Sequence, residues 1–128
     1  MKPATVEWVF KAEEDWEAAR QLNRQRKNPI YDAVCFHCQQ SVEKYLKARL
    51  DEAGIPVPKT HDLIQLLGLT IHVEPKWTVL HPYVAVLTPY AVGYRYPGLT
   101  AMKADAKAAI KDCRKVRRAV RLALGLPV

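Results

Sequence analysis

The sequence has no apolar run long enough to cross a bilayer, and acidic residues interrupt its first stretch, where a secretory signal peptide would be apolar. It also has only three cysteines, Cys35, Cys38 and Cys113, each at an apolar position of a predicted helix. An odd set of three suggests no disulfide framework, and reduced interior thiols are typical of the cytoplasm. We therefore expect a soluble, cytoplasmic protein with no membrane contact.

Internal repeats, low-complexity tracts and interdomain linkers are also missing from the sequence. A chain of 128 residues is of the usual size for one domain and can bury a core without disulfides or metals. We therefore treat residues 1–128 as a single domain.

Acids are scarce in the last predicted helix, although they nearly balance the bases at the start of the chain. Over the whole chain the formal net charge is +7. Residues 101–124 hold eight Lys or Arg and two Asp, so this segment supplies most of the excess. Such an excess attracts RNA, DNA or an acidic protein without choosing among them.

Apolar residues recur at spacings of three and four along most of the chain, which predicts helices with a buried side. The predicted helices span residues 5–26, residues 29–53, a short segment opening after Thr60, a bent segment over 77–94, and residues 101–124, with 68–74 as an irregular link. Pro29 suits a first helical turn and Gly54 a C-terminal cap. Thr60 and Thr100 suit N-terminal caps. Long helices with short connections predict an all-α fold, an antiparallel up-and-down bundle of four main helices plus one short helix.

The first and last helices have distinct charged sides. In the first helix the acids precede the bases, an order that suits the helix dipole, and we interpret them as a solvated face with local charge pairing. These acids are Glu13, Glu14, Asp15 and Glu17. In the last helix no aromatic residue interrupts the basic side, so we favour a solvated face over an RNA-binding track. The basic side comprises Lys103, Lys107, Lys111, Arg114, Arg118 and Arg121, and the apolar side runs from Met102 to Leu124.

The helix over residues 29–53 carries a polar strip beside its apolar side. His37, Gln40, Ser41 and Lys44 fall within one to two turns of one another and therefore share that strip. Together they offer an imidazole, an amide, a hydroxyl and an ammonium group to a ligand. The alternatives are a structural hydrogen bond for the histidine and a solvated charge for the lysine. His61, at the start of the short helix, has the same alternative.

The sequence around His37 also suggests a metal or redox site, because Cys35 and Cys38 flank it. The two thiols lie inside the predicted helix, however, and not at its N-terminus, where the helix dipole would lower a thiol pKa. A zinc site would also need Cys113 and a fourth ligand to converge. We favour apolar packing for the cysteines and predict neither a metal nor a cofactor.

Three phrases follow one another along the chain: FHCQQSVEKYLKARL, then GIPVPKTHDL, then YRYPG before the last helix. Together they resemble the HEPN domain family, small all-α proteins of prokaryotes and higher eukaryotes. The resemblance implies a compact helical bundle that often forms a homodimer. It also implies a frequent partner, a minimal nucleotidyltransferase, in toxin–antitoxin or defence systems.

The same resemblance singles out Arg95. Many members of the family are metal-independent ribonucleases in which an arginine, followed a few residues later by a histidine, cleaves RNA through the ribose 2′-hydroxyl. Arg95 matches that arginine, but residues 100–102, where the histidine would stand, are threonine, alanine and methionine. None of these is a base at neutral pH. A ribonuclease would therefore need His37 or His61 in the same pocket.

The neighbours of Arg95 indicate phosphate binding. A guanidinium between Tyr94 and Tyr96 can fork onto a phosphate while the two rings offer stacking faces to bases. Gln40 and Lys44 complete the predicted anion pocket.

Three functions stay open at this point. In the first, the chain binds a nucleotide or an RNA phosphate near Arg95 as one component of a toxin–antitoxin-like pair with a nucleotidyltransferase. In the second, it is a metal-independent endoribonuclease that uses Arg95 with His37 or His61. In the third, it is a structural or dimerisation module whose arginine pairs with an acid such as Asp62 or Glu43.

Overall fold

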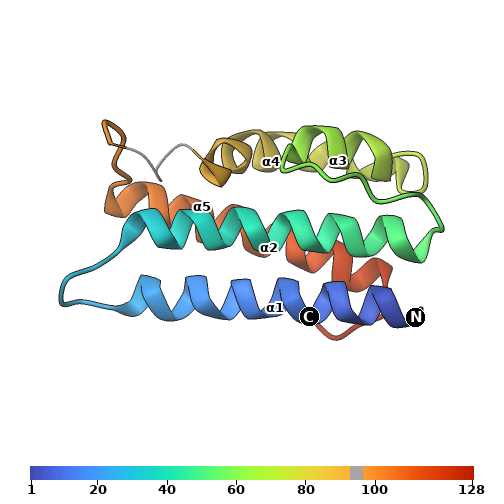
Figure 1. Ribbon diagram of the computed structural model, residues 1–128, viewed down its shortest axis with the longest axis horizontal. Helices are drawn as coiled ribbons and strands as arrows, with labels where there is room; N and C mark the ends of the chain where they lie inside the picture. Colours follow the sequence, from blue (N-terminus) through green and yellow to red (C-terminus); the bar gives the residue numbers. More distant parts are fainter. Residues whose placement is uncertain (93–96) are drawn as a thin grey trace.

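The structure is a computed structural model that describes residues 1–92 and 97–128 (Figure 1). Its elements are α1 (Pro3–Arg24), α2 (Tyr31–Glu52), α3 (Leu63–Thr70), η1 (Pro75–Leu80), α4 (His81–Leu87), η2 (Thr88–Ala91) and α5 (Lys103–Ala123), where η marks a 3₁₀ helix. The predicted all-α bundle is confirmed, with η1, α4 and η2 together forming the bent fourth main helix. No helix in the described ranges is both long and apolar enough to span a bilayer.

α2 is the central helix of the bundle. Figure 1 shows α1 running beside it in the opposite direction, α5 behind it, and α3 and α4 along its other side. Because α2 packs against all of these, it is buried around much of its circumference, as its apolar pattern predicted. Tyr45, Leu46 and Leu50 have no exposed surface. The polar side chains of α2 are therefore confined to the seams between helices.

The start of α2 and its connection from α1 differ from the prediction. The helix begins at Tyr31 and not at Pro29. Asn28 has a φ of 52°, a left-handed turn that delays the helix by two residues. At the other end, the predicted glycine cap is confirmed, since Gly54 has a φ of 74° just after α2.

α3 is capped by Asp62, not by Thr60 as predicted. The Asp62 carboxylate accepts hydrogen bonds from the backbone N–H groups of Ile64 at 2.9 Å and Gln65 at 3.3 Å. The Thr60 hydroxyl accepts only from the backbone N–H of Asp62, at 3.1 Å. The predicted C-terminal end of α3 was also wrong. The helix continues to Thr70, so the irregular link predicted over residues 68–74 is reduced to residues 71–74.

α5 begins two residues later than predicted, and Thr100 does not cap it. Asp105, in the first turn, accepts from the backbone N–H of Met102 at 2.8 Å. Asp32 of α2 accepts from the backbone N–H of Ala101 at 2.6 Å. These two carboxylates take the capping role, and Met102, predicted to be buried, is 66% exposed.

A cluster of polar contacts ties α1 to α5 and corrects the prediction of a solvated acidic face on α1. Arg117 donates from Nε and Nη2 to the two carboxylate oxygens of Glu13, at 2.9 and 2.6 Å. The Tyr45 hydroxyl donates to Glu13 and accepts from Arg121 at 3.1 Å. Burial and the hydrogen bond to Glu13 raise the pKa of Tyr45 to about 12. The local pairs that were predicted are Lys11–Glu14 and Glu17–Arg20.

The three cysteines are free and buried, as expected for packing residues. Burial raises the pKa of Cys35 to about 12, and a hydrogen bond to Cys113 together with burial raises the pKa of Cys38. The thiols of Cys35 and Cys38 are therefore protonated and poorly reactive at neutral pH. Among the residues that the structure describes, no three His, Cys, Asp or Glu are placed to hold a metal ion.

Candidate functional site

His37 and Lys44, two of the predicted site residues, meet at Asp15 of α1. The Nδ1 atom of His37 lies 2.8 Å from one carboxylate oxygen of Asp15. The Nζ atom of Lys44 donates to the other oxygen at 2.5 Å. The Asp15 side chain is 12% exposed, so this carboxylate is held in the seam between α1 and α2 by two partners from α2.

The charge state of Asp15 follows from these contacts. Burial alone would raise the pKa of Asp15, but the hydrogen bonds and positive charges of His37 and Lys44 outweigh burial, so that the pKa is lowered overall. Asp15 is therefore an ionised anchor at neutral pH. It fixes the His37 ring and compensates the charge of Lys44.

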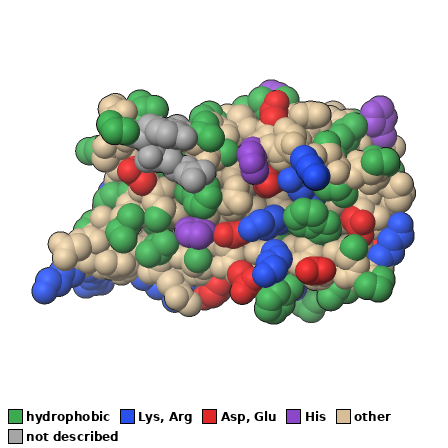
Figure 2. Space-filling model, in the orientation of Figure 1, with side chains coloured by type: hydrophobic (Ala, Val, Ile, Leu, Met, Phe, Trp, Pro, Cys, Tyr) green, Lys and Arg blue, Asp and Glu red, His purple; other side chains and the backbone are tan. Residues whose placement is uncertain are grey.

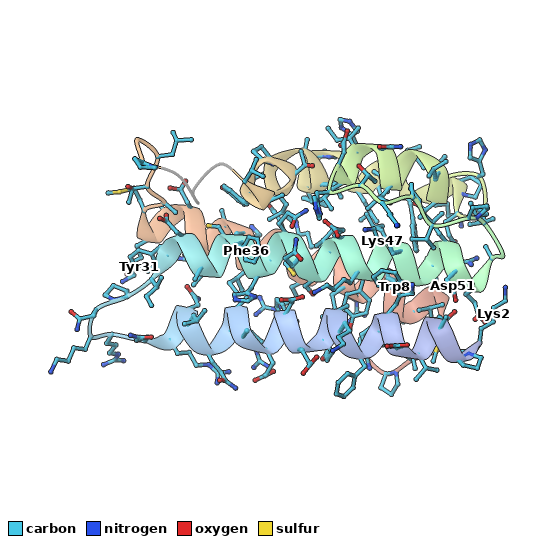
Figure 3. All side chains as sticks on the ribbon, viewed as in Figure 1. Lys2, Trp8, Tyr31, Phe36, Lys47 and Asp51 are labelled. Atoms are coloured by element: carbon cyan, nitrogen blue, oxygen red, sulfur yellow. The ribbon has the colours of Figure 1, made fainter. Side chains whose placement is uncertain are left out.

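A second histidine, His61, is anchored in the same way on another acid, Glu43 of α2. The Nδ1 atom of His61 lies 2.9 Å from Oε1 of Glu43, and Lys47 donates to Oε2 at 3.1 Å. The Glu43 side chain is only 5% exposed, whereas that of His61 is 69% exposed. The ammonium of Lys47 also lies 5.6 Å from the centre of the Trp8 ring, and Figure 3 labels Lys47 on α2 and Trp8 between α2 and α1.

Gln40 belongs to this second cluster and not to the first. Its Nε2 atom donates to Oε1 of Gln39 at 2.7 Å. Gln39 in turn donates to Glu43 and to the backbone carbonyl of His61, both at 3.1 Å. The structure thus brings His37 and Lys44 together on Asp15, and it connects Gln40 with His61 through Gln39 and Glu43.

Both imidazoles present the same nitrogen to their surroundings. Each uses Nδ1 for its carboxylate, and within residues 1–92 and 97–128 neither Nε2 has a hydrogen-bond partner. The Phe36 ring meets the His37 ring edge-on at 5.5 Å between centroids. Figure 2 shows the histidines among acids and bases on the face that α1, α2 and α3 share. A singly protonated ring offers an Nε2 lone pair to a proton, and a doubly protonated ring offers an N–H to an anion.

Arg95, Tyr94 and Tyr96 lie in residues 93–96, outside the described residues, so their roles stay predictions. The preceding segment, η2, packs against α2. The two acids named as alternative partners of Arg95 hold other groups in the described part of the chain. Asp62 caps α3, and Glu43 binds His61, Gln39 and Lys47.

The anchoring residues Asp15, Glu43 and Gln39 were missed as site residues by sequence reasoning. A usable signal was present for Asp15, because it lies three residues after Ala12 and four before Ala19, apolar residues at helical spacing that are both buried. An acid within a buried stripe requires a partner. For Glu43, the sequence shows a lysine four residues later, but this spacing does not reveal whether the pair is buried.

Comparisons with known proteins bear on these observations. The HEPN domain family model matches residues 5–123, which include every described residue of the two histidine clusters. A search of curated proteins found no match, and a search of solved structures found none either. The helical architecture and the family match agree over nearly the whole chain. The chain therefore belongs to the HEPN domain family, whose members are in general nucleotide- or RNA-related.

Proposed function

We propose that this HEPN-domain protein binds a nucleotide or an RNA phosphate where His37 of α2 and His61, just before α3, are held by acids. One observation carries this proposal: two imidazoles, 30% and 69% exposed, are each fixed through Nδ1 on a largely buried carboxylate. A ligand phosphate would accept hydrogen bonds from Nε2–H of the protonated rings. The rings are already oriented, so binding loses little side-chain entropy.

The charges of the two clusters assign a role to Arg95. Asp15 compensates Lys44, and Glu43 compensates Lys47, so each cluster offers an anion no positive charge beyond that of a protonated imidazole. An anion therefore needs another cation, and the proposal assigns this role to Arg95, with Tyr94 and Tyr96 as stacking faces. Lys44, predicted as a direct ligand, acts here through Asp15.

The test uses ligands too short to reach other surfaces of the protein, a labelled dinucleotide and labelled ATP. Fluorescence anisotropy compares the Arg95→Ala variant and a His37→Ala/His61→Ala double variant with the unchanged protein. The matched control is a His72→Ala/His81→Ala double variant, which removes two exposed histidines outside the clusters. Binding that is lost in the first two variants and kept in the control supports the proposal. Equal affinity in all four proteins contradicts it.

The anchored imidazoles also favour a second candidate, a metal-independent endoribonuclease. In this scheme Nε2 of His37 or His61 takes the proton of a ribose 2′-hydroxyl, and the resulting 2′-oxygen attacks the adjacent phosphorus. The bond from phosphorus to the 5′-oxygen breaks, the leaving oxygen takes a proton, and a cyclic 2′,3′-phosphate remains. Arg95 would stabilise the negative charge on the phosphorus oxygens.

Labelled RNA incubated with the protein in EDTA tests this second candidate. Cleavage that persists in EDTA, disappears in Arg95→Ala and stops when the attacking ribose lacks its 2′-hydroxyl supports an enzyme. If the RNA stays intact while the dinucleotide binds, only the binding function is supported and the enzyme is contradicted. Failure of both binding and cleavage would assign the chain a structural role.

By its family, we propose that the chain works with a minimal nucleotidyltransferase in a toxin–antitoxin-like pair. A homodimer is proposed on the same ground. Trp77 and Tyr90 belong to the core of this chain and Tyr83 packs against it, so these aromatic residues give the dimer no separate support. Co-purification with the product of a neighbouring nucleotidyltransferase gene tests the pair, and sedimentation at micromolar concentration tests the dimer.

A further inference from the structure

A groove runs between α1 and α5, away from the histidine clusters. It consists of three adjoining hollows. The first, of about 320 Å³, is lined by residues that include Trp16 and Arg114, and the second, of about 560 Å³, by residues that include Arg114 and Asn23. The third, also about 560 Å³, is lined by residues that include Asn23 and Tyr31. Neighbouring hollows share one lining residue, Arg114 or Asn23, so the three lie in a row along the surface between α1 and α5.

Among the described residues, every charged side chain that lines this groove is Lys or Arg. The lining bases are Arg20, Arg24, Arg26, Lys103, Lys107, Lys111, Arg114, Arg117 and Arg118. Arg117 is neutralised by Glu13, and Arg20 pairs with Glu17. The other lining bases form no ion pair with any described carboxylate. Figure 2 shows part of this basic surface along the lower left edge, where α1 ends.

Trp16 forms the floor at one end of the groove. Its ring is 4% exposed, and the guanidinium carbons of Arg114 and Arg117 each lie 5.5 Å from the ring centre, with that of Arg20 at 5.8 Å. The ring therefore holds the guanidinium groups in place by cation–π contact and is too covered to stack on a base. Of these three groups, Arg117 and Arg20 are paired with acids, so Arg114 and the unpaired bases of the other two hollows supply the positive charge that would attract an extended anion.

The sequence alone favoured a solvated face for the bases of α5. The fold changes this interpretation, because the bases at the end of α1 face those of α5 across a hollow. At about 1.5 Å per residue, the part of α5 from Lys103 to Arg118 is about 22 Å long, which matches a strand with several phosphates better than a single nucleotide.

We infer that the α1–α5 groove binds the sugar–phosphate backbone of single-stranded RNA without reading its sequence. Half-buried Tyr31 is the single uncovered aromatic residue among the described lining residues, so there is no row of stacking platforms for base recognition. The buried apolar side of α5 packs against α2 and is therefore not free to enter a membrane. This inference goes beyond the proposed function and does not rest on it, since the groove and the histidine clusters are separate surfaces.

The salt dependence of RNA binding tests the groove directly. Lys107 and Lys111 are exposed, so a Lys107→Gln/Lys111→Gln variant removes two charges with little effect on the fold. A labelled oligo(U) of about 12 nucleotides is titrated at several salt concentrations between about 50 and 200 mM. We expect weaker binding at every salt concentration, and a slope of log affinity against log salt that is about 1.4 smaller in magnitude, from about 0.7 for each lost phosphate contact.

The matched control is a Lys11→Gln/Lys76→Gln variant, which lowers the net charge equally with exposed lysines outside the groove. An unchanged slope in this control and in His37→Ala/His61→Ala supports the groove. An equal decrease in the lysine control would mean that only overall charge matters and would overturn the inference. So would an absence of oligo(U) binding by the unchanged protein, or groove-dependent binding to phosphatidylserine vesicles without binding to RNA.

Discussion

Replacing Asp15 with asparagine tests the central ion-pair seam of the bundle. The substitution keeps the shape of the side chain but removes its charge, leaving Lys44 without its anion and giving His37 an amide instead of a carboxylate. Removing one partner of a fully buried ion pair costs about 3–5 kcal/mol, and removing an exposed pair costs about 0–1 kcal/mol. Asp15 is 12% exposed but its partners are 25–30% exposed, so we expect a loss of about 2 kcal/mol at pH 7.

The pH dependence of this loss identifies its cause. The pKa of Asp15 is lowered in the folded protein, so its stabilising effect is fully present above the ordinary aspartate pKa and is lost as the pH falls through the folded value. The difference in stability between the unchanged protein and Asp15→Asn should therefore be largest near neutral pH. It should shrink below about pH 4, where Asp15 of the unfolded chain begins to be protonated, and should vanish once the pH is below the lowered pKa of the folded protein.

Urea unfolding followed by circular dichroism measures this difference at pH 7 and near pH 3. The adjacent residue supplies the control, because Glu14 makes only a 3.8 Å contact with Lys11 and both side chains are more than half exposed. Glu14→Gln should change the free energy of unfolding by less than about 0.5 kcal/mol. The reasoning is refuted if Asp15→Asn is as stable as this control at pH 7, or if its deficit is the same at both pH values.

Three further predictions follow from local contacts. Asp62→Ala should lower the free energy of unfolding by about 1 kcal/mol because it removes the cap of α3. Thr60→Ala should lower the free energy of unfolding by less, and chemical denaturation of the two variants measures the difference. Cys35, with a pKa raised to about 12, should resist a thiol reagent in the folded protein and react once the chain is unfolded; rapid reaction under native conditions would contradict its burial. Because the pKa of Tyr45 is also raised to about 12, its contribution to stability should hold below about pH 10 and decline towards pH 12. Tyr45→Phe should abolish this decline in the free energy of unfolding between about pH 10 and about pH 12, as measured by urea unfolding.

The spacing of apolar residues was sufficient to predict the main helices. α2 is buried where its pattern indicated, and the glycine after it ends the helix in the left-handed conformation expected. Helix starts were less predictable, because a cap depends on which side chain reaches a free backbone N–H. Thr60 and Asp62 are both good capping residues, and only the geometry of the turn selected Asp62.

The candidate site was predicted only in part. His37, Gln40 and Lys44 were placed on one side of α2 by their spacing, and the structure divides them between two clusters. His61 was assigned to the start of the short helix without its partner Glu43. The division arises because each cluster forms around an acid in a different seam, and helical spacing does not specify which seam a residue faces.

The order of apolar and polar residues by itself determined that this chain is helical and which sides of its helices are buried, and three short sequence phrases carried the family resemblance. Local hydrogen bonds and burial of apolar side chains follow from spacing along one helix, so they can be read without coordinates. Only the tertiary structure decided which charges meet. Lys44 and its acid Asp15 lie 29 residues apart, and Glu13 and Arg117 lie 104 residues apart. Contacts of this kind, and the basic groove between α1 and α5, depend on how separate helices pack.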